Sequence, residues 1–220
     1  MSTTALRIYY GGTFDPVHDG HLAIARAACE ALNSEVTLMP AADPPHRAAP
    51  GADAQQRCAM LELAIADDPR LRIDRRELLR TGPSYTVDTL QDLRSEYGED
   101  APLALLIGAD SLLALPDWRR WRDLFALTHL IVAERPGSLL GGDWPAPLAE
   151  MIEGRWTQRA AALVESPAGS LYRLHQPLRI ESATRIRQEI TDRMAHWRDW
   201  VPPPVADYIV QHGLYRKQTS

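Results

Sequence analysis

The sequence predicts an α/β fold in which a parallel sheet is flanked by helices. Short apolar runs alternate with longer segments of helical periodicity along the 220 residues, an order typical of parallel sheets. The run LALLIG (103–108) is apolar throughout, as expected for a strand that is buried on both faces. Neither an internal repeat nor a break in composition divides the chain. We therefore expect one domain over 1–220, with a small C-terminal helical part at about 176–220.

The first half of the chain reads as three strands, each followed by a helix. LRIYY (6–10) is a short apolar run typical of a buried strand. The helix expected at 21–32 has one apolar face, formed by Leu22, Ala25, Cys29 and Leu32. The other pairs are a strand at 35–40 with a helix at 56–66, and a strand at 71–74 with a helix at 84–97. Asp53 and Gln56 form the pattern of a capping box before the second helix.

The second half is expected to add three strands and two helices. The strands are LALLIG and the runs at 128–137 and 170–175, and a loop with Trp118 and Trp121 follows the first of them. Residues 138–168 are rich in Pro and Gly and receive no assignment. A short helix with a polar start at 182–191 and a terminal helix at 203–215 form the C-terminal part.

Composition limits the partners of the protein. A net charge of -5 gives no overall attraction to nucleic acid, so any bound phosphate group must be small and held locally. No apolar run approaches membrane-spanning length and no signal peptide pattern begins the chain, so a cytoplasmic protein that does not bind membranes is expected. Cys29 and Cys58 lie in apolar helical segments and fit buried, reduced thiols, with a disulfide or metal pair as the less favoured alternative. The oligomeric state cannot be read from the sequence.

The stretch YYGGTFDPVHDGH (9–21) places two glycines and two histidines between a strand and a helix. In open α/β sheets, ligands lie beyond the carboxyl ends of the strands. Gly11 and Gly12 let the backbone turn tightly and let a ligand approach it closely. His18 and His21 are three residues apart, so they can share one side of the first helical turn, where free N–H groups favour an anion. The stretch predicts a polyphosphate site.

Simpler interpretations of these residues stand beside this one. A Gly-Gly turn between a strand and a helix is common and supports nucleotide binding only weakly. The pair could ligate a metal, although no third ligand stands nearby at suitable spacing. One of the two histidines could also be a core residue whose hydrogen bonds are satisfied. The residues alone favour phosphate binding about as strongly as these alternatives together.

GGTFDPVHDGH resembles the signature of the nucleotidyltransferase superfamily, (H/T)-x-G-H after a strand. Further stretches follow in the order found in bacterial nicotinate-nucleotide adenylyltransferases, and the chain resembles that family over nearly its whole length. These stretches are PPHR (44–47), PSYTVDTL (83–90), GADSLLALPDW (108–118), HLIVAERPG (129–137), SATRIR (182–187) and VADYIVQHGLYR (205–216). The resemblance implies a Rossmann-like sheet and transfer of the adenylyl group of ATP to nicotinic acid mononucleotide in NAD biosynthesis. The products are nicotinic acid adenine dinucleotide and pyrophosphate, and Mg²⁺ accompanies the ATP.

The resemblance also implies which residues meet ATP. His18, His21 and Arg187 would act on the phosphates, and no protein nucleophile is needed because the mononucleotide phosphate itself attacks. Ser182 or Thr184 would cap a helix whose free N–H groups face the same anion. Asp110 would lie by the ribose, or cap the next short helix, or both. The remaining ATP residues are Gly11, Gly12, Thr13, Phe14 and Gly108.

A second set of residues would bind the mononucleotide. Trp118 would stack on the pyridine ring, while backbone N–H groups near Thr86 and Arg119 meet the carboxylate. Tyr85 would help to define the ring pocket. Arg47 and Arg135 are candidates for the mononucleotide phosphate. The protein itself is expected to supply no metal site.

The sequence departs from the family pattern at two positions. Glu181 stands where the family usually has an apolar residue, and Ala41 stands where Asn is frequent. Two related functions fit the sequence less well: a phosphopantetheine adenylyltransferase has Thr in place of His18, and a cytidylyltransferase lacks the PSYT and PPHR stretches. Use of nicotinamide mononucleotide as acceptor, or a regulator that binds nucleotide without catalysis, are the alternatives that remain.

Overall fold

The computed structural model describes residues 5–42, 51–80, 82, 84–134, 137, 140–141 and 144–216. They form a seven-stranded sheet with the order β3-β2-β1-β4-β5-β7-β6, and every neighbouring pair is parallel. The strands are β1 (Arg7–Gly12), β2 (Val36–Pro40), β3 (Leu71–Ile73), β4 (Leu103–Gly108), β5 (His129–Ala133), β6 (Trp156–Thr157) and β7 (Leu171–Leu174). The predicted α/β fold with a parallel sheet is confirmed. Among the described residues, no helix is long and apolar enough to cross a membrane.

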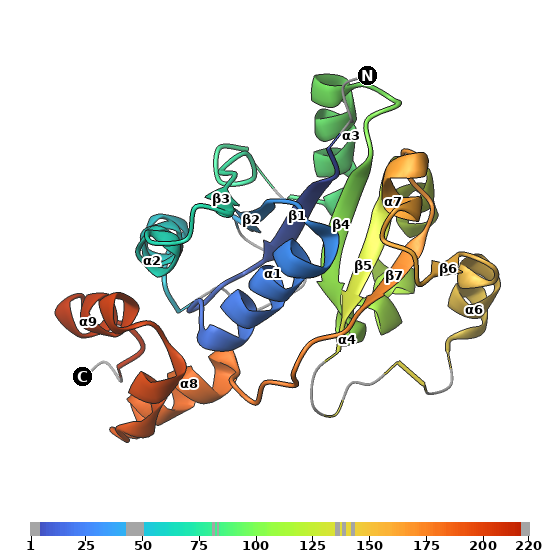
Figure 1. Ribbon diagram of the computed structural model, residues 1–220. Coiled ribbons are helices and arrows are strands. Elements are labelled where there is room, and N and C mark those ends of the chain that lie inside the picture. Colours follow the sequence, from blue (N-terminus) through green and yellow to red (C-terminus); the bar gives the residue numbers. More distant parts are fainter. Residues whose placement is uncertain are drawn as a thin grey trace.

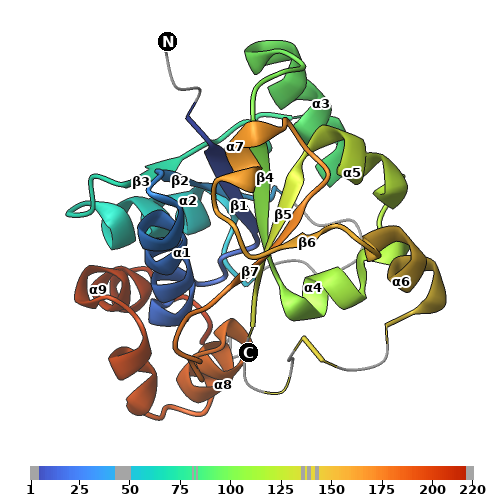
Figure 2. The same cartoon turned by 45° about the vertical axis from the view of Figure 1, so that its right-hand side comes forward.

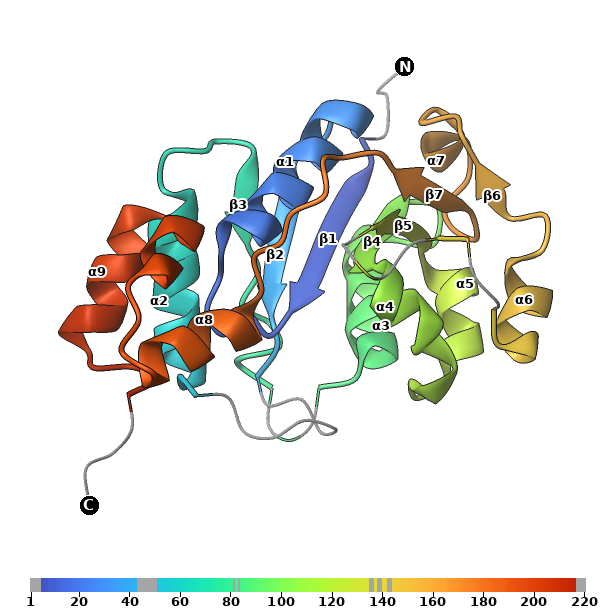
Figure 3. The same cartoon turned by 90° about the horizontal axis from the view of Figure 1, so that it is seen from below.

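Helices cover both faces of this sheet (Figure 1). One core packs α1 (Asp19–Leu32), α2 (Ala54–Ile65), α7 (Ala162–Glu165), α8 (Ala183–Thr191) and α9 (Pro203–Gln211) against one face. The other core packs α3 (Thr86–Tyr97), α4 (Ala109–Leu113), α5 (Leu124–Leu127) and α6 (Ala146–Ile152) against the opposite face. All six residues of β4 are buried because both cores cover this strand. Figure 3 shows α1 and α3 on opposite sides of β1 and β4.

The C-terminal helices extend the first of these two layers. Figure 2 shows α8 and α9 beside α1 and α2. Val205 and Ile209 of α9 belong to the same buried cluster as Leu61 of α2. This packing brings Tyr215, which follows α9, close to the loop that follows β1.

The pairing between the two central strands, β1 and β4, stops before either strand ends. The pairing of β1 with β4 ends at Tyr10 and Leu106. Beyond this point β1 continues along β2 to Gly12, and β4 continues along β5 to Gly108. The two central strands therefore diverge at their carboxyl ends. The strand order also reverses here, because β2 and β3 lie on one side of β1 while β4, β5 and β7 lie on the other.

The structure corrects several predicted boundaries. The strand predicted at 128–137 spans only His129–Ala133. It starts at His129 because Thr128 is the C-cap residue of α5 and bonds to the backbone of Leu103 through its hydroxyl. The predicted loop with Trp118 and Trp121 contains two 3-10 turns, Leu115–Asp117 and Trp121–Asp123, which precede α5. Such short turns lack the repeated apolar period by which a helix is recognised. The unassigned residues at 138–168 include α6, β6 and α7.

Arg94 of α3 joins the loops at the amino ends of the strands. The side chain of Arg94 is buried, with 4% of its surface exposed. Its guanidinium donates to five backbone carbonyls, those of Leu127, Gly98, Glu99, Ala101 and Pro167. These carbonyls immediately precede β4, β5 and β7, so one side chain fixes the entry to three strands.

Replacement of Arg94 is expected to destabilise the fold. The variant Arg94→Leu leaves buried carbonyl oxygens without donors, and we expect the free energy of unfolding to fall by about 3 kcal/mol. Urea unfolding monitored by circular dichroism measures this loss. The control is Arg72→Leu, which removes an exposed arginine of β3 paired with Glu35 and should cost less than about 1 kcal/mol. Equal losses in the two variants would contradict the role assigned to Arg94.

Candidate functional site

A cavity of about 760 Å³ lies where β1 and β4 diverge. Its lining includes every predicted site residue that the structure describes. These are Gly11, Gly12, Thr13, Phe14, His18, His21, Tyr85, Thr86, Gly108, Asp110, Trp118, Arg119, Ser182, Thr184 and Arg187. Arg47 and Arg135 fall outside the described residues. Residues from five separate stretches of sequence therefore border one space, as expected for the carboxyl edge of a parallel sheet.

The sequence predicts a tight turn at Gly11 and Gly12, and this prediction is wrong. Gly11 and Gly12 are extended and form the last two residues of β1. The backbone turns at Phe14, whose φ is 50°. The buried ring of Phe14 packs edge-on against Tyr10 and His21, which fixes this unusual conformation. Gly12 is needed because a Cβ there would lie 3.0 Å from the Phe14 ring, whereas a Cβ at Gly11 would meet no atom within 4 Å.

His18 and His21 form a stacked pair at the amino end of α1. Their ring centroids are 3.7 Å apart and their planes differ by 29°. His18 is the N-cap residue, and its backbone N–H donates to Nδ1 of His21 over 3.3 Å. Both rings are buried, with exposed fractions of 2% and 9%, yet both border the cavity. The predicted placement of the two rings on one side of the first turn is confirmed, and the donor role of the rings stays a prediction.

The start of α8 adds a second group of hydrogen-bond donors for an anion on the same wall. Ser182 is the N-cap residue, and its hydroxyl accepts a hydrogen bond from the backbone N–H of Arg185. Ala183 and Thr184, in the first turn, border the cavity with the N–H groups that a helix leaves free at this end. Arg187 also lies on this wall, and its Nη1 donates to the backbone oxygen of Asp15 over 2.6 Å.

The opposite wall is aromatic and contains another helix start. Trp118 is half-buried against the second core, and it borders the cavity. Tyr85 is the N-cap residue of α3, and Thr86 is the first residue of that helix. The guanidinium of Arg119 lies 4.6 Å from the centroid of the Tyr85 ring. This wall can hold a flat ring and meet a negative group with the amino end of a helix.

Asp110 and Glu77, two of the three carboxylate residues that line the cavity, lie in different environments. Asp110 is exposed in the first turn of α4, where Gly108 is the N-cap residue, so the capping role considered for Asp110 is wrong. Glu77 is 7% exposed and accepts a hydrogen bond from the hydroxyl of Thr89 over 2.8 Å. Burial raises the pKa of Glu77 above its usual 4.5, and the bond from Thr89 opposes this shift. Glu77 lies in no recognisable motif, so the sequence did not indicate that it borders the site.

Asp15 and Arg57 are two further buried charges that sequence reasoning missed. The carboxylate of Asp15 accepts hydrogen bonds from the backbone N–H groups of Gly51 and Ala52, at 2.8 and 3.1 Å. Arg57 of α2 is fully buried and donates to the backbone oxygens of Thr13 and Ala41, at 2.7 and 2.6 Å. Arg57 thus fixes the ends of β1 and β2 beside the cavity. Its place within an apolar helix face was the only signal in the sequence.

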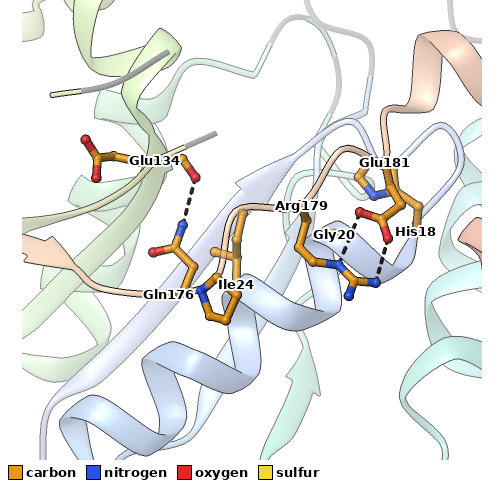
Figure 4. Close-up of a pocket in the computed structure, with 8 residues that line it drawn as sticks. His18, Gly20, Ile24, Glu134, Gln176, Arg179 and Glu181 are labelled. Atoms are coloured by element: carbon orange, nitrogen blue, oxygen red, sulfur yellow. Dashed lines mark hydrogen bonds and ion pairs between the residues drawn. The ribbon is translucent and has the colours of Figure 1, made fainter. Parts of the chain in front are cut away.

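The departure at Glu181 is accommodated away from the large cavity. Figure 4 shows Glu181 in a separate small hollow, together with His18 and Gly20. Arg179 holds the carboxylate of Glu181 with two hydrogen bonds of 3.2 and 2.5 Å. The positive charge of Arg179 therefore offsets the negative charge of Glu181, which weakens its repulsion of an anion in the large cavity. At the other departure, the backbone of Ala41 accepts from Arg57 and donates to Gly12, so this position serves through its main chain.

The chain is similar to known proteins over nearly its whole length. The family model described as cytidylyltransferase-like matches residues 9–189. A protein of Stenotrophomonas maltophilia named probable nicotinate-nucleotide adenylyltransferase is 57% identical, over 98% of this chain and 99% of its own length. A protein of Xylella fastidiosa with the same name is 47% identical, over 96% of both chains. Among solved structures, the nicotinic acid mononucleotide adenylyltransferase of Plasmodium falciparum complexed with NaAD has a similar fold. Its TM-score is 0.73 at 16% identity, over 96% of this chain and 97% of that chain.

The two glycines of β1 are expected to differ in their response to substitution. Gly12→Ala forces a methyl group against the buried Phe14 ring, and we expect it to lower the free energy of unfolding by about 1–3 kcal/mol. Gly11→Ala meets no protein atom and should change this free energy by less than about 0.5 kcal/mol. Thermal and urea unfolding of both variants measure the difference. A more stable Gly12→Ala variant would contradict the packing described.

Glu77 is expected to make stability depend on pH. Because its pKa is raised in the folded state, the unfolded chain ionises first as the pH rises above 4.5, and the folded state loses stability relative to it. Glu77→Gln removes this term while its amide oxygen can still accept from Thr89. The variant should gain stability relative to the wild type as the pH rises from about 4 to about 8. A difference between the two proteins that stays constant over this range would refute the assignment.

Proposed function

Because the chain belongs to the nicotinate-nucleotide adenylyltransferases, within the cytidylyltransferase-like proteins, we propose that its cavity transfers the adenylyl group of ATP to nicotinic acid mononucleotide. The products are nicotinic acid adenine dinucleotide and pyrophosphate. One observation carries the proposal. The cavity has groups that can donate hydrogen bonds to an anion on one wall, and an aromatic surface with a helix start on the other. The first wall suits a triphosphate, and the second suits an acidic pyridine ring.

His18 and His21 stabilise the transition state. An oxygen of the mononucleotide 5′-phosphate attacks the α-phosphorus of ATP, and the bond between this phosphorus and the bridging oxygen of pyrophosphate breaks. Negative charge grows on the oxygens around the α-phosphorus during the exchange. The two imidazoles stand at the positive end of α1 and are buried, so donors there act in a poorly screened environment. No protein group forms a covalent bond.

Arg187 and the start of α8 hold the leaving pyrophosphate. The β- and γ-phosphates carry most of the charge of ATP. N–H groups at Ala183 and Thr184 and the guanidinium of Arg187 give this charge fixed partners along the same wall as the histidines. Their geometry favours departure in line with the attack.

The aromatic wall selects the acceptor. Trp118 stacks on the pyridine ring, and the amino end of α3 at Thr86 meets its carboxylate. A neutral carboxamide gains less than a carboxylate from the positive end of a helix. Nicotinic acid mononucleotide is therefore the expected acceptor, ahead of nicotinamide mononucleotide. Asp110, which is exposed at the rim of the cavity, is placed to accept from ribose hydroxyls.

Mg²⁺ enters with ATP. Reactions of this kind commonly use a divalent metal that neutralises phosphate charge. Within the described part of the chain, no three carboxylate, imidazole or thiol groups gather into a metal-binding cluster. Mg²⁺ keeps several waters in such sites, so the phosphate oxygens of ATP would supply most of its other ligands and the ion would neutralise part of their charge.

The whole chain works as one domain, with 176–220 as a helical subregion. The buried cluster around β1 includes residues of both α2 and α9. Arg187 of α8 reaches the loop that follows β1. Part of the proposed site thus comes from the C-terminal subregion. Separation of this subregion from the sheet would remove groups that donate hydrogen bonds to the phosphates.

The enzyme works in the cytoplasm. Cys29 and Cys58 are free and buried. Burial raises the pKa of both thiols, which keeps them protonated and unreactive. Such thiols fit a reducing compartment.

Release of pyrophosphate tests the proposed reaction. With ATP, Mg²⁺ and nicotinic acid mononucleotide, the wild type should release pyrophosphate, and a chelator should stop it. His18→Ala and His21→Ala should each lower kcat by ~100- to 1000-fold, because each removes a donor to the transition state. His212→Ala is the matched control, since it removes an exposed imidazole of the C-terminal region.

The same assay with nicotinamide mononucleotide and with other phosphate acceptors separates the alternative functions. Turnover that is faster with nicotinamide mononucleotide would reverse the assigned preference. Binding of ATP with no release of pyrophosphate in the presence of any acceptor would indicate a regulator. Full activity in the double variant His18→Ala/His21→Ala would exclude the mechanism.

A further inference from the structure

The buried carboxylate of Asp15 joins four parts of the chain at the edge of the cavity. Asp15 follows the turn at Phe14 and has 5% of its surface exposed. Besides the N–H groups of Gly51 and Ala52, it accepts a hydrogen bond from the hydroxyl of Tyr215, with 2.7 Å between that oxygen and Oδ1. Tyr215 is 200 residues away in the sequence and lies beyond α9. The segment after α9 thus reaches, through Tyr215, the loop between β1 and α1.

Tyr215 is held in place from two sides. Its backbone oxygen accepts a hydrogen bond from the hydroxyl of Thr191 over 2.9 Å. Its ring lies against Gly51 so closely that a Cβ at Gly51 would be 2.8 Å away. Burial and the neighbouring Asp15 raise the pKa of Tyr215, so its hydroxyl keeps its proton and stays a donor. The contact with Asp15 is therefore directional and fixed.

Arg187 shares this network. Its Nη1 donates to the backbone oxygen of Asp15 over 2.6 Å and lies 3.7 Å from Oδ2 of the same residue. Its Nη2 donates to the hydroxyl of Thr184 over 3.4 Å. About a third of the Arg187 side chain is exposed toward the cavity. The orientation of Asp15 thus determines where the guanidinium stands, and Tyr215 bonds directly to the Asp15 carboxylate.

We propose that Tyr215 is a positioning residue for adenylyl transfer, acting through Asp15 to aim Arg187 at the phosphates of ATP. This inference rests on the proposed function of Arg187. Without the Tyr215 hydroxyl, Oδ1 of Asp15 keeps only the hydrogen bond from the backbone N–H of Ala52, and the carboxylate can turn toward Arg187. The guanidinium is then drawn away from the phosphates. ATP is held less well, while the aromatic wall that binds the mononucleotide is unchanged.

Steady-state kinetics of Tyr215→Phe test this proposal. We expect KM for ATP to rise about 3- to 10-fold, as loss of one hydrogen bond of the network predicts, with KM for nicotinic acid mononucleotide changed less than about 2-fold. Tyr208→Phe is the matched control, since it removes a hydroxyl from a partly buried tyrosine of α9. An equal rise for both substrates, or the same rise in the control, would reduce Tyr215 to a structural residue.

A double-mutant cycle identifies the route of the effect. If Tyr215 acts through Arg187, then Tyr215→Phe should change KM for ATP by less than about 2-fold in an Arg187→Gln background. Effects that multiply independently would overturn the proposal. Should Tyr215→Phe fail to fold by circular dichroism, Thr191→Val removes the bond that holds its backbone, and an unchanged KM for ATP would then overturn the proposal. An inactive wild type would instead contradict the proposed function itself.

Discussion

The divergence of β1 and β4 is the constraint on which the site depends. All strands point the same way, so the helices that follow them begin at the same edge of the sheet. Pairing of the two central strands stops at Tyr10 and Leu106, which leaves room between the loops that follow them. The amino ends of α1 and α4 then face one space, and the strand order places helices of both layers on either side of it. A ligand with charge at one end and a ring at the other finds both partners across this opening.

Recognition of a highly charged substrate by this chain is a local property. The protein as a whole carries a net charge of -5, so long-range attraction does not bring ATP to it. The cavity instead combines helix starts, a buried imidazole pair and one guanidinium on a single wall. Nearby carboxylates have partners within the protein: Arg179 pairs with Glu181, and Asp15 accepts hydrogen bonds from backbone N–H groups and from Tyr215. The wall can therefore be positive although acidic residues lie close to it.

Local pattern was sufficient to predict most of the fold and the glycine–histidine stretch of the site, whereas the rest of the predicted cavity lining came from the resemblance to the family. The unbroken apolar run of β4, the buried face of α1 and the capping box at Asp53 all follow from neighbours in sequence. Asp15 and Arg57 could not be predicted, because their partners come from remote parts of the chain. The hydroxyl of Tyr215 is 200 residues from Asp15, and the carbonyl of Thr13 is 44 residues from Arg57. The turn at Phe14 was missed for a related reason, since packing of its ring, rather than a glycine, determines that conformation.

The five carbonyls that Arg94 gathers lie at the opposite edge of the sheet from the cavity. This anchor therefore lies at the other end of the same strands from the proposed chemistry. Sequence drift or deliberate engineering at the Arg94 edge could tune heat tolerance while turnover stays the same. Relatives from hot and cold habitats would then diverge first among the loops that enter the strands, and last among those that leave them.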